Sequence, residues 1–174
     1  MISLPLVYTI LALVSYTSSF WYLFIHLMSK RTPNLWCYGL IVVLGLILHG
    51  LVLSQDMITP LGVNYDVFNL ISFTSGLMLS LSLILSLIRP ILPLNLIGIP
   101  VAAIGLILGF SLSQSNQTIE HHGVGLDTHI ILSLSAYAVL LMATIQAVLL
   151  WFQDRELKKK QKKRIWVNLL PPFQ

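Results

Sequence analysis

Five long apolar stretches without charged residues constrain this chain more than any other feature of its sequence. A helix needs roughly 20 mostly apolar residues to cross a bilayer. Only 9% of the 174 residues are charged, against about 25% in average soluble domains, so a water-soluble core of this length could not be covered. The sequence therefore predicts an integral membrane protein. The predicted spans cover about residues 4–27, 36–54, 68–88, 94–112 and 128–152.

The spans are predicted to be helices rather than barrel strands. A spanning segment must satisfy its backbone hydrogen bonds within the bilayer, and barrel strands would alternate polar and apolar residues, which these stretches do not. The predicted fold class is all-α, a polytopic membrane helix bundle. It comprises one membrane domain over residues 1–154 and a basic cytoplasmic tail over residues 155–174.

The basic residues give the bundle a predicted orientation. All ten lysines and arginines fall on one side of the five spans: at Lys30 and Arg31, at Arg89, and in the segment 155–164. The opposite side carries only the acids Asp56, Asp66, Glu120 and Asp127. This positive-inside pattern places the N-terminus outside and the tail in the cytoplasm. There the tail is expected to lie near anionic lipid headgroups rather than to bind nucleic acid.

Two histidines lie near the predicted outer surface. His49 stands about five residues before the outer end of the second span, or roughly 8 Å below the surface at the helical rise per residue. His129 stands at the outer end of the fifth span, and Ser133 and Tyr137 follow it at i+4 and i+8 on one stripe. We expect this stripe to face the bundle interior. The same is expected of a seam of small or polar residues in the third span: Asn69, Ser72, Ser75, Gly76 and Ser80.

The composition of the spans narrows the chemistry. No Lys, Arg, Asp or Glu lies within a predicted span, which argues against a proton relay built on buried carboxylates. No nucleophile stands with a base and an orienting group, so no enzymatic activity is predicted. Neutral imidazoles ligate haem iron well, so His49 and His129 are the candidate ligands of a haem in an outer cleft, with His121 and His122 in reserve. Zinc or copper fits less well, because no ligand cluster accompanies the histidines.

The segment "HIILSLSAYAVLLMATIQAVLL" resembles the cytochrome c assembly protein family, the haem-handling membrane proteins of the CcsA/ResC type. His129, Ser133 and Tyr137 match the family's H-x-x-x-S-x-x-x-Y helix, and "LHGLVL" around His49 is similar to its YpjD- and HemX-like branch. The exit "DRELKKK" matches as well. The tryptophan-rich outer segment of the haem-export members has no counterpart here, and relatives of this kind continue through further spans.

The resemblance implies a haem-binding or haem-handling protein of the bacterial inner membrane. In it, His129 would be an axial ligand and Ser133 and Tyr137 would line the helix face behind it. Its partners would be membrane lipid and other membrane subunits or further helices. Two alternatives remain at this stage. One is a structural or regulatory membrane subunit that keeps the fold without a cofactor. The other is a small transporter, which the lack of a repeat and of buried charge disfavours.

Overall fold

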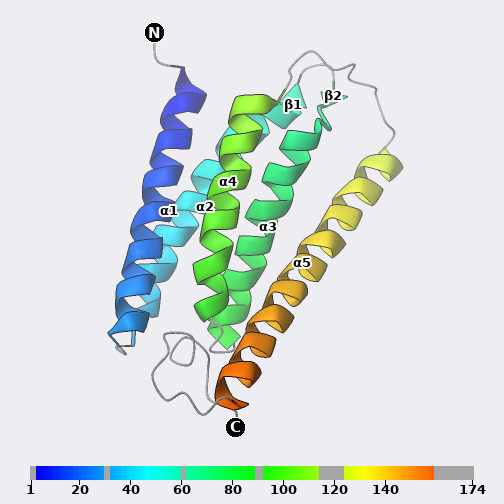
Figure 1. Ribbon diagram of the computed structural model, residues 1–174. Helices are drawn as coiled ribbons and strands as arrows, with labels where there is room; N and C mark the ends of the chain where they lie inside the picture. The colour runs from blue at the N-terminus through cyan, green and yellow to red at the C-terminus, as the bar shows by residue number, and fades with distance from the viewer. Residues whose placement is uncertain (1–2, 30–31, 60–61, 89–91, 114–123, 159–174) are drawn as a thin grey trace.

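The computed structural model describes residues 3–29, 32–59, 62–88, 92–113 and 124–158, and these are almost entirely helical. Five long helices run up and down the molecule, and two short strands pair as an antiparallel hairpin (Figure 1). The helices are α1 (Leu4–Met28), α2 (Leu35–Met57), α3 (Val67–Ile88), α4 (Leu92–Leu112) and α5 (Val124–Lys158). The strands are β1 (Ile58–Thr59) and β2 (Gly62–Val63).

Each of the five helices is long and apolar enough to cross a membrane, which confirms the predicted candidate spans within the described residues. The helix boundaries differ from the predicted ones by a few residues, most of all in α5. That helix begins at Val124 and continues to Lys158, past the predicted end at residue 152. The start of α1 and the end of α5 lie at opposite ends of the bundle (Figure 1). The end that carries β1 and β2 is called the hairpin end below.

Local sequence signals explain where two of the helices begin. The side chain of Asn34 accepts hydrogen bonds from the backbone N–H groups of Trp36 and Cys37, at 3.1 and 3.4 Å, and so caps α2. The carboxylate of Asp66 accepts from the N–H of Phe68 at 3.1 Å where α3 starts. Each contact satisfies a backbone donor that has no partner within its own helix.

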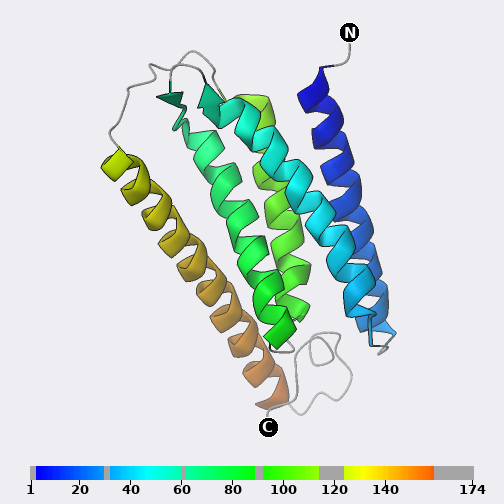
Figure 2. The ribbon, with the colours of Figure 1, turned by 180° about the vertical axis from the view of Figure 1, so that it is seen from behind.

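Helices α1 to α4 pack against one another, whereas α5 packs chiefly on α3. Both views of the ribbon place α5 beside α3 and far from α1, with a tilt that carries it away from the other four helices toward the hairpin end (Figures 1 and 2). Correspondingly, only 11% of the most apolar 18-residue stretch of α5 is buried inside the bundle, against 44% of the corresponding stretches of α3 and α4. The bundle is therefore four well-packed helices with a fifth attached along one side.

The small and polar seam of α3 faces the bundle, as predicted. Asn69, Ser72 and Ser75 are buried, and a Cβ added at Gly76 would lie 3.3 Å from the ring of His49 on α2. Small residues let membrane helices approach closely and gain van der Waals contact. The approach is closest between α3 and α4. There, a Cβ added at Gly105 would lie only 2.8 Å from the Cβ of Ser75.

We predict that Gly105→Ala destabilises the bundle by about 1–3 kcal/mol, the usual range for an overpacked core. Its methyl group would meet the Ser75 side chain at a distance that real Cβ contacts do not show, so α3 and α4 would have to move apart. Thermal unfolding in detergent measures the effect. Gly39→Ala is the matched control, because nothing lies within 4 Å of a Cβ at Gly39 on α2. Equal midpoints for the two variants would contradict the prediction.

Candidate functional site

His49 is the centre of a buried polar link between three helices. It lies in α2 with only 2% of its surface exposed. Its Nδ1 is 3.0 Å from the hydroxyl of Tyr16 on α1, and its Nε2 is 2.9 Å from the Oγ of Ser72 on α3. A neutral imidazole has one N–H donor and one acceptor nitrogen, and both hydroxyls can take either role. Each tautomer of His49 is therefore fully satisfied.

This link leaves His49 poorly suited to bind iron. A haem ligand needs a ring nitrogen with an unshared lone pair, but both nitrogens of His49 already have a hydrogen-bond partner. The cavity beside the ring, between α2 and α3, has a volume of only about 190 Å³. Sites for drug-sized ligands usually measure about 300–1,000 Å³. The geometry of His49 is that of a residue that holds helices together.

His129 has a different environment. It is exposed on α5, and none of its ring atoms has a hydrogen-bond partner among the described residues. Ser133 is half-buried and Tyr137 is 63% exposed. The expectation that this stripe faces the bundle interior was therefore wrong.

The reason lies in the opposite side of α5. Ala138 and Met142 are buried there, packed in a cluster with Met78 of α3 and Leu94 of α4. At about 100° per residue, His129 falls on the far side of the helix from these contacts. The small residues Ala136, Ala143 and Ala147 are exposed as well.

The two predicted ligands, His49 and His129, do not share the lining of any of four cavities formed by described residues. Of these four, His49 lines the small one between α2 and α3, and His129 lines none. The common cleft for the two histidines therefore stays a prediction. His121 and His122 lie outside the described residues. The part of the chain that is described also contains no group of three or more His, Cys, Asp or Glu side chains that could hold a metal ion.

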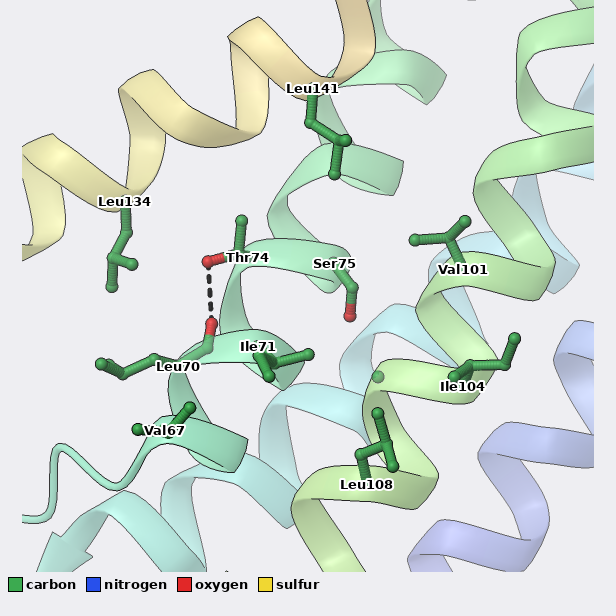
Figure 3. Close-up of a pocket in the computed structure, with 11 residues that line it drawn as sticks. Val67, Leu70, Ile71, Thr74, Ser75, Val101, Ile104, Leu108, Leu134 and Leu141 are labelled. Atoms are coloured by element: carbon green, nitrogen blue, oxygen red, sulfur yellow. Dashed lines mark hydrogen bonds between the residues drawn. The ribbon is translucent and has the colours of Figure 1, made fainter. Parts of the chain in front are cut away.

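The tilt of α5 leaves two larger cavities on either side of its contact with α3. The first, of about 410 Å³, lies where α3, α4 and α5 meet, and it is lined by Leu70 of α3, Val101 of α4, and Leu134 and Leu141 of α5 (Figure 3). Its lining is almost wholly aliphatic. The hydroxyl of Thr74 at its edge is engaged within its own helix, since it donates to the carbonyl of Leu70 at 2.7 Å.

The second, which we call the α2–α5 cavity, measures about 500 Å³ and lies toward the hairpin end, between α2, α3 and α5. Unlike the first, it has polar groups at its edge. The hydroxyl of Tyr65 donates a hydrogen bond to Asp127 Oδ1 at 2.6 Å. Partial burial and, next, the neighbouring Asp127 carboxylate raise the pKa of Tyr65 to about 12. The phenol therefore stays protonated as a donor at neutral pH.

Sequence reasoning missed Tyr16 and the pair formed by Tyr65 and Asp127. A signal for Tyr16 was present, because a tyrosine in the middle of an apolar span requires a hydrogen-bond partner for its hydroxyl. The partner's identity depends on which helices pack together, which the sequence pattern does not specify.

No family model, no curated protein and no solved structure matches this chain.

We predict that Tyr16→Phe lowers the free energy of unfolding by about 1 kcal/mol, within the range measured for hydrogen bonds between membrane helices. The change removes one hydroxyl and leaves His49 Nδ1 without its partner. Tyr137→Phe is the matched control, because its hydroxyl is exposed and has no partner among the described residues. A double-mutant cycle with Ser72→Ala, read by thermal unfolding in detergent, measures the coupling through the ring. Strict additivity would show that the link does not act as a unit.

Proposed function

We propose that this protein is a haem-handling membrane protein of the cytochrome c assembly type, with His129 as its haem ligand. The observation that carries the proposal is the exposed imidazole of His129, which has no hydrogen-bond partner among the described residues. Of the other two described histidines, His49 has both ring nitrogens engaged, and His26 lies in the last turn of α1, at the end of the bundle opposite the hairpin. His129 is the described histidine that is both exposed and close to the hairpin end.

The position of His129 also suits a large flat ligand with polar edges. It stands in the second turn of α5 at the hairpin end, on the side of the helix that no other described helix covers. Ser133 and Tyr137 continue the same stripe, so an apolar ring ligated by His129 could lie along α5 with two hydroxyls nearby. Two imidazoles can hold a haem iron from opposite faces. Under this proposal the second comes from outside the described residues, with His121 and His122 as the candidates of this chain.

A second candidate function rests on the hydrogen bonds of His49. Its ring joins α1, α2 and α3 with no nitrogen left over, as a purely structural histidine would. Under that hypothesis the protein is a non-catalytic membrane subunit, and the uncovered side of α5 contacts another membrane protein. In both hypotheses His49 is structural. They differ in whether His129 binds iron.

Haem titration of the purified protein in detergent separates the two functions. We expect the parent to give a saturable Soret shift, and His129→Ala to weaken haem binding at least tenfold and change the spectrum. His26→Ala and His49→Gln should bind as the parent does, because His26 lies in the last turn of α1 at the other end of the bundle and both ring nitrogens of His49 are engaged. A parent without a saturable Soret shift, or a His129→Ala variant identical to it, would reject the haem role and favour the cofactor-free subunit.

We further propose that the hairpin end faces outward from the bacterial plasma membrane. Asp56, Asp66 and Asp127 lie at that end, whereas Arg155 and Lys158 lie near the other. This distribution supports a cytoplasmic location for the end of α5, because basic residues are retained on that side of the membrane.

A reporter that is active only in the cytoplasm, fused after Gln174, should therefore be active. The same reporter inserted in the hairpin between Thr59 and Gly62 should be inactive. Activity in the hairpin and inactivity after Gln174 would overturn the proposed orientation. Activity at both positions would show that the helices between them do not cross the membrane an odd number of times.

A further inference from the structure

The α2–α5 cavity is amphipathic in a way that the other cavities are not. Most of its lining is apolar and includes Leu53 of α2, Phe73 of α3 and Ile131 of α5. Its polar residues, Ser54, Tyr65 and Asp127, lie toward the hairpin end of the bundle. Its volume of about 500 Å³ lies within the usual range for small-molecule sites. An occupant therefore needs an apolar body and a polar group at one end.

The charge at the edge specifies that polar group. The charged residue types described at the hairpin end are all acidic: Asp56, Asp66 and Asp127. The nearest described cation on α5 is Arg155, which lies 28 residues beyond Asp127, or roughly 42 Å along the axis at the helical rise. Among the described residues only the neutral Tyr65 hydroxyl bonds to the Asp127 side chain. This carboxylate is thus positioned to accept hydrogen bonds from a cation that the described residues do not supply.

A structural explanation of Asp127 accounts for only part of this. A carboxylate in the first turn of a helix is favoured by the helix dipole, whatever lies beside it. That effect does not require the apolar cavity that Asp127 lines together with Leu53, Phe73 and Ile131. The cavity and the carboxylate together have the composition of a binding site for a cationic amphiphile.

We propose that the α2–α5 cavity binds a phospholipid with a primary ammonium headgroup, its ammonium on Asp127 and its acyl chain against Leu53, Phe73 and Ile131. An ammonium group has three N–H donors, and charge-assisted hydrogen bonds to a carboxylate are stronger than neutral ones. A quaternary ammonium lacks such donors, and a glycerol headgroup lacks the positive charge. The proposal does not depend on haem binding, because His129 lies on the other side of α5 from the cavity.

Native mass spectrometry of the full chain released from dodecyl maltoside micelles tests the proposal. The probes are dioleoyl phosphatidylethanolamine, phosphatidylcholine and phosphatidylglycerol, each titrated separately. We expect the ethanolamine lipid to bind about tenfold more tightly than the other two. In Asp127→Asn, which keeps an acceptor for Tyr65 but removes the charge, the three affinities should become equal.

A pair of tryptophan variants locates the acyl chain. Ile131→Trp fills part of the apolar lining of the cavity and should reduce binding of all three lipids at least tenfold. Leu132→Trp is the matched control, because Leu132 is the next residue on α5, is 64% exposed and does not line the cavity. Equal affinities in the parent would overturn the proposal. So would a preference unchanged in Asp127→Asn, or equal losses in the two tryptophan variants.

Discussion

The need to satisfy polar groups away from water is the constraint on which the rest of this structure depends. Inside a bilayer a hydroxyl or an imidazole without a partner is costly, and water is not there to replace a missing one. The contact of His49 with Tyr16 and Ser72 solves this problem for three side chains at once. Because the three residues lie on different helices, the same contact fixes α1, α2 and α3 relative to one another. Apolar side chains alone could not fix the helices in this way, because they pack equally well against the acyl chains of lipids.

Helices α4 and α5 differ in how firmly contacts with their neighbours fix their positions. Helix α4 has Gly105 and Gly109 against the serines of α3, so shape fixes its position. Helix α5 has neither a buried polar partner in its middle nor a close small-residue contact. It is apolar on nearly every side, and it packs along one side only. The cavities beside it and its uncovered stripe both follow from that weak attachment, and both proposed sites are on this helix.

The sequence was sufficient to predict the spans and the inward face of α3, but not the rotation of α5. Span prediction needs only hydropathy summed over about 20 residues, and the seam of α3 contrasts with its leucine-rich remainder. In α5 the polar stripe of His129, Ser133 and Tyr137 competes with an apolar side formed by Leu134, Ala138, Leu141 and Met142. In water the polar stripe would be exposed without question. In a membrane either side can face lipid, so the neighbouring helix decides, and α3 takes the apolar one.

The two outer histidines show why depth in the membrane is a weak guide to chemistry. His49 and His129 stand near the same surface, and the sequence offered no reason to separate them. What separates them is hydrogen-bond saturation. To ligate iron, His49 would have to lose a bond to Tyr16 or Ser72 and leave a hydroxyl unpaired in a buried site, at a cost of about 1–3 kcal/mol. His129 has no such bond among the described residues, so under the haem proposal ligation of iron on α5 carries no comparable cost.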